Sequence, residues 1–264
     1  MEKNFWTSDK KNFSQLYNLS AIKIPSDIPA YKLTYDLLSP KGKIILDFGC
    51  FNGSSSRILL KLGAKKVIGC DKIRKHIEKA KEKYHSNNLL FIENKRLDSE
   101  KFYDFFDAVA MTFVHPTISN KRELTEAFKL ISKITRENAY LIILGLHQNS
   151  LKKKNHFLFY NPKLRNETDY KDGVPFKNEI KFPDSNICMR FLDYCWTEKT
   201  LKKLLEENNF KITKIISLKH NLKSREGKIL SEYLKELPEI KWIDEWKAPL
   251  YQIIVAKKIL QRYK

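Results

Sequence analysis

Cysteine, glycine and long apolar runs are all scarce in this chain of 264 residues. The four cysteines show no C-x-x-C spacing, so we expect buried thiols in a reducing cytosol rather than a zinc site or a disulfide framework. No segment approaches the roughly 18 consecutive apolar residues of a membrane-spanning helix. The first residues lack the apolar core of a signal peptide. These absences predict a cytoplasmic protein without a metal site or a membrane anchor.

Arginine is also rare, although the chain is strongly basic. The net charge is +19, but only nine of the 50 basic residues are arginine. Reading of base edges favours the planar fork of arginine, whereas lysines spread over many helices indicate a solvated surface. We therefore do not expect a nucleic-acid partner, despite the charge.

Two of the eight glycines bracket a turn in the most informative segment, residues 43–53. An apolar run there ends in Asp47, and Gly49 and Gly53 follow before a helix can start. Glycines at a strand-to-helix turn let backbone N–H groups approach a ligand closely. A second short apolar run ends in Asp71, close to the spacing of about 20 residues that separates such a turn from a ribose-binding acid. The pattern predicts a pocket for an adenosine-containing ligand at the carboxyl edge of a parallel sheet.

The acid ahead of the first glycine indicates which ligand this is. A carboxylate at Asp47 would repel a pyrophosphate but suits a cationic group. The order Asp47-x-Gly49-x-x-x-Gly53 resembles motif I of the class I S-adenosylmethionine-dependent methyltransferases, D-x-G-x-G-x-G, with Phe51 in place of the middle glycine. Two alternatives stay open: an ordinary turn with incidental glycines, and a noncatalytic methyltransferase-like partner protein in which Phe51 blocks the cofactor.

Apolar periodicity along the chain indicates one α/β domain, residues 1–264. The expected strands lie near residues 44–48, 67–71, 88–92, 106–114, 139–146, 210–218 and 248–256. The expected helices lie near residues 30–38, 54–62, 73–84 and 124–131, with another after Thr197 as its N-cap. The resemblance covers residues 40–258 and implies a Rossmann-like, doubly wound sheet of seven strands, mostly parallel, with the last strand antiparallel.

Three irregular segments are expected to cover the side of the sheet where the cofactor would bind. They are an N-terminal helical cap, residues 1–40, and two insertions, residues 147–196 and 219–247. The first insertion contains a predicted hairpin of residues 176–182 and 187–194. A covered pocket with aromatic and apolar walls suits a small molecule. We therefore predict transfer of a methyl group to an O or N atom of a small molecule. A protein or RNA methyltransferase that docks through its lysines is the alternative.

The resemblance also implies the residues of an S-adenosylmethionine site. They are Asp47, Gly49, Cys50, Gly53, Asp71, Lys72, Ile73, Asp98, Thr112 and Phe113. The expected N-terminal cap adds Tyr17, at the methionine end of the cofactor. Asp47 would act on the amino group of the cofactor, directly or through water, and Asp71 on the ribose hydroxyls. Asp98 would lie near the adenine amino group; alternatively, Asp98 or Ser99 would start the next helix as its N-cap.

Methyl transfer asks little of the protein beyond alignment and exclusion of water, because the sulfonium is already electrophilic. A general base is needed only when the acceptor atom starts protonated. His115 and His147 are the candidates because they follow the fourth and fifth strands; the alternative is a loop histidine bonded to backbone. His76, His85 and His220 are expected at the surface. The absence of an N-P-P-Y type tetrapeptide after the fourth strand argues against a nucleobase methylase.

Overall fold

The computed structural model describes residues 27–152, 160–163, 170–181, 188–218 and 249–260. Most of the expected N-terminal cap, including Tyr17, and the whole insertion 219–247 with His220 lie outside these residues. The described part of the cap is helix α2, Asp27–Leu38.

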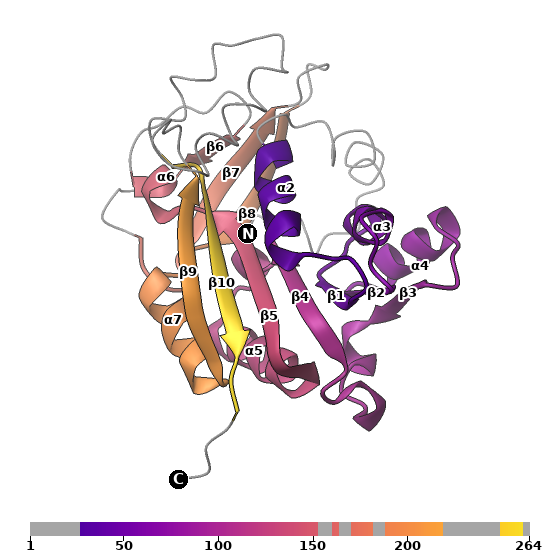
Figure 1. Ribbon diagram of the computed structural model, residues 1–264. Helices are drawn as coiled ribbons and strands as arrows, with labels where there is room; N and C mark the ends of the chain where they lie inside the picture. The colour runs from indigo at the N-terminus through magenta and orange to yellow at the C-terminus, as the bar shows by residue number, and fades with distance from the viewer. Residues whose placement is uncertain (1–26, 153–159, 164–169, 182–187, 219–248, 261–264) are drawn as a thin grey trace.

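A seven-stranded sheet forms the centre of the molecule, in the order β3-β2-β1-β4-β5-β10-β9 (Figure 1). Its strands are β1 (Ile44–Phe48), β2 (Lys66–Asp71), β3 (Leu89–Glu93), β4 (Phe106–Thr112), β5 (Thr135–Leu146), β9 (Phe210–Leu218) and β10 (Tyr251–Lys258). Neighbours from β3 to β5 pair in parallel, and β10 pairs antiparallel with both β5 and β9. The predicted fold class, including the single antiparallel strand, is confirmed.

Three strands, β4, β5 and β10, have an end that differs from the prediction by two residues or more for a local reason. Strand β4 ends at Thr112 rather than residue 114 because Phe113 has a φ of 54°, outside extended geometry. Strand β5 starts four residues early, at Thr135, and carries an irregularity where Asn138 has a φ of 63°. Strand β10 begins only at Tyr251, after Pro249, which has no N–H for the ladder.

Helices cover both faces of the sheet, as a doubly wound fold requires. Helix α2 packs on one face together with α3 (Ser54–Lys61) and α4 (Arg74–Lys83). Helices α5 (Lys121–Ile134) and α7 (Glu198–Glu207) pack on the other. Thr197 caps α7 as predicted, because its side chain accepts a hydrogen bond from the Thr200 backbone N–H.

A second, smaller sheet lies within the first insertion. Strands β7 (Pro175–Lys181) and β8 (Cys188–Tyr194) form the predicted hairpin, and β6 (Tyr160–Lys163) adds a third antiparallel strand. A short helix, α6 (Gln148–Lys152), leads into it from β5. Figure 1 shows this small sheet at the top, at the end of the large sheet toward which the β9 arrow points. Strand β9 runs in the same direction as β5 and the other parallel strands, because β5 and β9 both pair antiparallel with β10. The insertion therefore lies at the carboxyl ends of the parallel strands.

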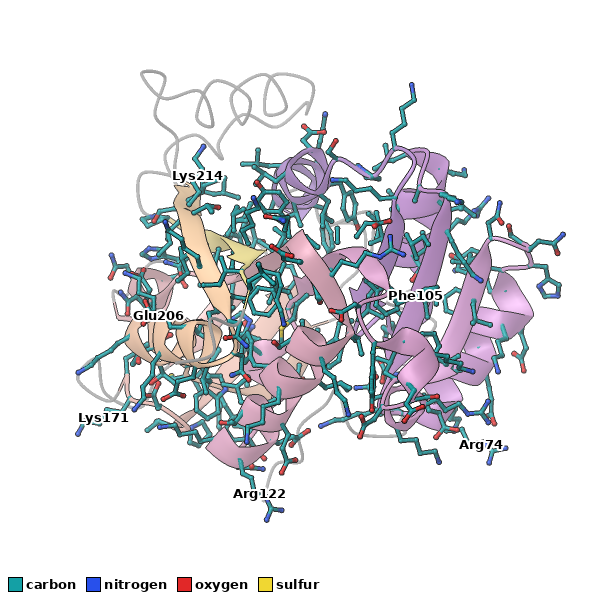
Figure 2. The ribbon with its side chains drawn as sticks, turned by 60° about the horizontal axis from the view of Figure 1, so that its bottom comes forward. Arg74, Phe105, Arg122, Lys171, Glu206 and Lys214 are labelled. Carbon is teal, nitrogen blue, oxygen red and sulfur yellow. The ribbon has the colours of Figure 1, made fainter. Side chains whose placement is uncertain are left out.

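Charged side chains of the described residues point outward on several sides of the molecule (Figure 2). The labelled Arg74, Arg122, Lys171 and Lys214 of Figure 2 extend from four different elements or loops toward different sides. Cys50, Cys70 and Cys195 are buried free thiols, as expected. No helix in the described part of the chain is long and apolar enough to cross a membrane.

Candidate functional site

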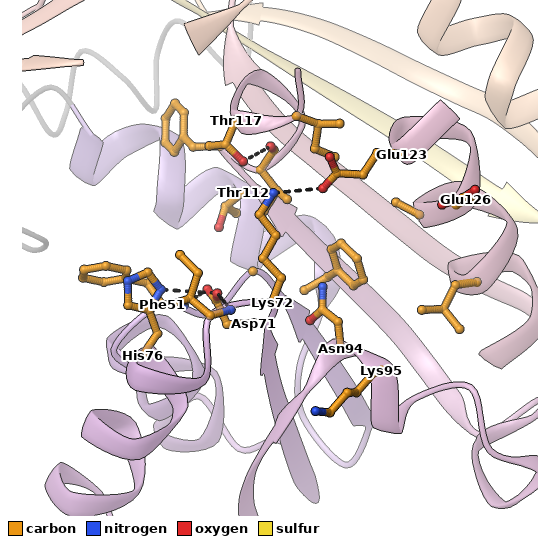
Figure 3. Close-up of a pocket in the computed structure, with 18 of the residues that line it drawn as sticks. Phe51, Asp71, Lys72, His76, Asn94, Lys95, Thr112, Thr117, Glu123 and Glu126 are labelled. Atoms are coloured by element: carbon orange, nitrogen blue, oxygen red, sulfur yellow. Dashed lines mark hydrogen bonds and ion pairs between the residues drawn. The ribbon is translucent and has the colours of Figure 1, made fainter. Parts of the chain in front are cut away.

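A pocket of about 410 Å³ lies at the carboxyl ends of β1, β2, β3 and β4. One wall comes from the turn after β1, the opposite wall from α5, and the floor from the ends of the strands (Figure 3). Seven of the predicted site residues line it: Gly49, Asp71, Lys72, Ile73, Asp98, Thr112 and Phe113. The sheet thus brings together side chains from four separate crossovers.

The glycine turn has the tight geometry that its residues predict. Gly49 has a φ of 79°, and a Cβ there would lie 2.3 Å from a methyl group of Val114. The N–H groups of Gly49 and Cys50 both donate to the Cys70 carbonyl at 2.8 Å. This ties the turn to the end of β2. Only glycine leaves room for the chain to pass so close to the residues after β4.

Gly53 and Cys50 support the turn through packing and do not line the pocket. Gly53 also has a left-handed φ, 80°, and a Cβ there would meet the Phe91 ring at 2.5 Å. Burial raises the pKa of the Cys50 thiol well above its ordinary value, so the thiol stays protonated. Neither residue lines the pocket. Their contribution is to hold the turn against β2, β3 and α4.

Asp47 differs from the expectation that its carboxylate faces the ligand. Its Oδ2 accepts hydrogen bonds from the hydroxyls of Ser55 and Ser56, at 2.5 and 2.6 Å, and the residue is 1% exposed. Burial raises the pKa of this carboxyl, and the two serine hydroxyls oppose that rise. Asp47 does not line the pocket. In this structure the carboxylate joins the end of β1 to the first turn of α3.

Asp71 faces the pocket, as predicted, and backbone groups fix its orientation. Its Oδ2 accepts from the Phe51 N–H at 3.1 Å, and its Oδ1 from the Ile73 N–H at 2.8 Å. A carboxylate offers about four acceptor positions, so these two bonds leave capacity for ligand hydroxyls. Asp71 therefore has the geometry of an acceptor for a diol.

Lys72, beside it, reaches across to the opposite wall of the pocket. Its Nζ lies 2.9 Å from Oε1 of Glu123 in the first turn of α5, and both side chains are about 40% exposed (Figure 3). An exposed ion pair of this kind contributes about 1 kcal/mol or less. The pair spans the pocket but is weak enough to rearrange around a ligand.

The residues after β3 divide between pocket and surface. Asp98 lines the pocket, but its carboxylate pairs with Lys133 at 2.9 Å. The helix that follows is a single 3-10 turn, Glu100–Phe102, and its N-cap position is Ser99, the second of the two residues that the alternative named, not Asp98. Asn94 also lines the pocket, and its buried Oδ1 has no hydrogen-bond partner among the described residues. Asn94 was not among the site residues predicted from the sequence.

An aromatic group closes the pocket beyond β4. Thr112 and Phe113 line the pocket. The centroid of the Phe113 ring lies 5.9 Å from that of Tyr31 in α2 and 5.7 Å from that of Tyr251 in β10. The described part of the N-terminal cap thus reaches the end of the site next to β4. Aromatic pairs at these separations favour edge-to-face contact and a stiff wall.

His115 and His147 follow β4 and β5, as predicted, yet neither lines the pocket. His115 is buried against Gly145, where an added Cβ would lie 2.2 Å from its ring. Burial lowers its pKa to about 4. In His147, Nδ1 accepts from the Asn149 N–H at 3.0 Å, and Nε2 lies 3.1 Å from Ser217 Oγ. His147 is therefore bonded to backbone, which is the alternative that the sequence left open.

His76 is the residue whose predicted place was wrong. It was expected at the surface, but it lines the pocket, and its side chain is only 14% exposed. The sequence contained a signal for this position of His76. The residue lies five positions after Asp71, in the first turn of the helix after β2, and that turn must face the same edge of the sheet. His85, just after α4, is exposed as expected.

The fold matches that of known methyltransferases. Residues 45–138, which carry the pocket, match the family model of the methyltransferase domain. Comparison with curated proteins gives no significant match.

Solved structures resemble the whole chain at low sequence identity. An S-adenosylmethionine-dependent methyltransferase from Clostridium acetobutylicum has a TM-score of 0.60 at 14% identity, covering 94% of this chain and 98% of its own. One from Mesorhizobium loti has a TM-score of 0.59 at 15% identity, with coverages of 88% and 98%. The 1,6-didemethyltoxoflavin-N1-methyltransferase of Burkholderia thailandensis, solved with its substrate and S-adenosylhomocysteine, has a TM-score of 0.53 at 14% identity, with coverages of 94% and 86%. Residues 45–138 therefore match the methyltransferase domain, and the chain has the seven-stranded fold of the class I S-adenosylmethionine-dependent methyltransferases.

Proposed function

We propose that this protein is an enzyme that transfers the methyl group of S-adenosylmethionine to an O or N atom of a small molecule by direct displacement. The observation that carries the proposal is the Asp71 carboxylate, fixed by two backbone N–H groups at the rim of a pocket that the Gly49 turn shapes. In this pocket Asp71 holds the ribose, and the turn after β1 approaches the methionine end. When bound, the cofactor supplies the electrophilic methyl group.

The adenine base belongs between β2 and α5. Ile73 and residues of α5, Ala127 and Leu130, give that part of the pocket apolar walls. Asn94 and Asp98 stand at its edge, and Asp98 is already paired with Lys133. The Asn94 side chain has spare hydrogen-bonding capacity, so we assign it the adenine amino group in preference to Asp98.

The acceptor site is proposed to extend from the methyl end over β4 and β5, under the N-terminal cap and the two insertions. The small sheet β6–β8 lies at the carboxyl ends of the parallel strands, and α2 brings Tyr31 to the Phe113 ring. A base role for His115 or His147 requires this extension, because neither ring reaches the described pocket. Enclosure would give the dry, aligned geometry that displacement at a methyl carbon needs. The Burkholderia enzyme, which has a similar fold, binds the small molecule 1,6-didemethyltoxoflavin together with S-adenosylhomocysteine.

Binding of S-adenosylhomocysteine tests the proposal. Isothermal titration of the purified protein without added metal should show one site, and Asp71→Ala should weaken binding by about 1–3 kcal/mol through lost hydrogen bonds to the ribose. Glu126→Ala, an exposed acid on α5, is the matched control, since it removes a carboxylate from the same pocket without touching the ribose acid. A wild-type protein that shows no binding at millimolar ligand would contradict the enzyme and favour a noncatalytic partner protein.

A further inference from the structure

His76 lies against the back of the proposed ribose acid. Its Nδ1 is 3.2 Å from Asp71 Oδ1, and the two side chains are 14% and 11% exposed. Figure 3 shows the imidazole between the Asp71 carboxylate and the Phe51 ring. All three residues line the pocket. The histidine is therefore placed to act on the carboxylate rather than on solvent.

The turn residue Phe51 holds that imidazole in place. The two rings lie edge to face, with centroids 4.3 Å apart and planes at 65°. Phe51 has a φ of 50°, a left-handed conformation that costs a residue with a Cβ about 1 kcal/mol or more. Its own N–H donates to Asp71 Oδ2. A strained residue that contacts both partners indicates that the local arrangement is held for a purpose.

The hydrogen bonds to Asp71 show what the histidine adds. The two backbone N–H groups hold one position on each carboxylate oxygen. Nδ1 of His76 is buried and has no in-line hydrogen-bond partner in the described chain, although Asp71 Oδ1 lies beside it. A buried nitrogen without a hydrogen bond lowers the stability of the fold by about 1–3 kcal/mol, unless a small movement of the side chain completes the bond. Hydrogen bonds of this kind commonly tighten when a ligand arrives.

We propose that His76 is a positioning residue for the ribose subsite: it orients the Asp71 carboxylate toward the cis-diol of a nucleoside, and the Phe51 ring holds it there. The proposal rests on the proposed function, because it takes a nucleoside as the ligand of Asp71. It gives the phenylalanine that replaces the middle glycine of motif I a structural role. A blocked pocket is not needed to explain that residue.

The test is a thermodynamic cycle in which one change is made in the protein and the other in the ligand. Binding of adenosine and of 2′,3′-dideoxyadenosine is titrated against wild type and His76→Phe, which keeps a ring against Phe51 but removes the N–H. His76→Phe should weaken adenosine about tenfold and leave dideoxyadenosine within twofold, because only the diol uses the oriented carboxylate. His76→Gln restores a donor and should recover part of the loss. His85→Phe, at the exposed histidine after α4, should bind both nucleosides like wild type.

The outcomes separate the two proposals. Equal losses for both nucleosides, or no loss for adenosine, would overturn the role of His76 while wild-type binding of S-adenosylhomocysteine still supports the function. Failure of the wild type to bind S-adenosylhomocysteine overturns both. Circular dichroism melts of each variant establish that the fold is retained. If His76→Phe does not fold, the same comparison is made with His76→Gln against wild type, with an adenosine-specific loss of two- to fivefold expected.

Discussion

Burial of one histidine at the end of β4 sets a pH dependence for the stability of the fold. His115 is 7% exposed and its pKa falls from 6.5 to about 4 in the folded protein, because burial penalises the charged ring. The native state therefore favours the neutral ring, and the unfolded state binds the proton first. Its contribution to stability is present in full above pH 6.5 and is lost as the pH falls toward 4.

We expect this single group to remove about 3 kcal/mol of unfolding free energy between these pH values. Urea unfolding of wild type and His115→Gln at pH 7, 5.5 and 4.5 measures it, since the variant has no ring to titrate and should lose less stability on acidification. Burial raises the pKa of Asp47, so this group changes the stability in the opposite sense as the pH falls. Both proteins contain Asp47, so its effect cancels when they are compared. Parallel losses in the two proteins would show that His115 does not titrate as its burial implies.

At the scale of one element, helix α7 depends on its first turn. The Thr197 side chain accepts from the Thr200 N–H at 3.2 Å, while the Thr197 N–H donates to Asp172 Oδ1 at 2.7 Å. Asp172 also accepts from the Thr200 hydroxyl, so the end of the insertion is fastened to the helix that follows it. The α7 residues Leu201, Leu204 and Leu205 pack into the core on the α5 side of the sheet. A loosened cap therefore weakens both the core and the attachment of the insertion.

Thr197→Ala should lower the free energy of unfolding by about 1 kcal/mol, because the Thr200 N–H loses its acceptor. Thr197→Ser keeps the hydroxyl and serves as the control, with an expected loss of a few tenths of a kcal/mol. Chemical denaturation of the three proteins at pH 7 gives the comparison. Equal stability of wild type and the alanine variant would mean that Asp172 alone secures this helix start.

At the scale of the whole molecule, the positive charge of the described residues is dispersed. Their basic side chains extend from several sides, and some pair with acids on the same helix, as Lys32 does with Asp36 and Lys202 with Glu198. A protein that grips nucleic acid instead concentrates its cations along one groove or stripe. The charge distribution agrees with a solvated lysine surface and a small acceptor.

Binding of a mixed-sequence RNA should accordingly be weak and should collapse as salt rises from 50 to 200 mM, because only released counterions drive it. Fluorescence anisotropy with a labelled RNA across that range measures the slope, and heparin competition checks that the contact is unspecific. Tight, sequence-selective binding near 150 mM salt would contradict the small-molecule acceptor and favour the RNA methyltransferase.

The sequence by itself determined the strands, the glycine turn and the place of Asp71, while the architecture of the sheet was implied by the resemblance to a family. These follow from local patterns: apolar runs of strand length, glycines where the backbone must turn left-handed, and an acid at the end of the next strand. Because β1 and β2 pair in parallel, with Asp47 opposite Gly69, residues at their carboxyl ends must meet at one edge.

Only the tertiary structure decided which side chains face the ligand pocket. Asp47 turned to the serines of α3, and His76 and Asn94 turned into the pocket. Glu123 reached Lys72 across a separation of 51 residues. Such choices depend on how helices pack across a sheet and which face each crossover presents. Those contacts form between segments far apart in the chain, and no local pattern records them.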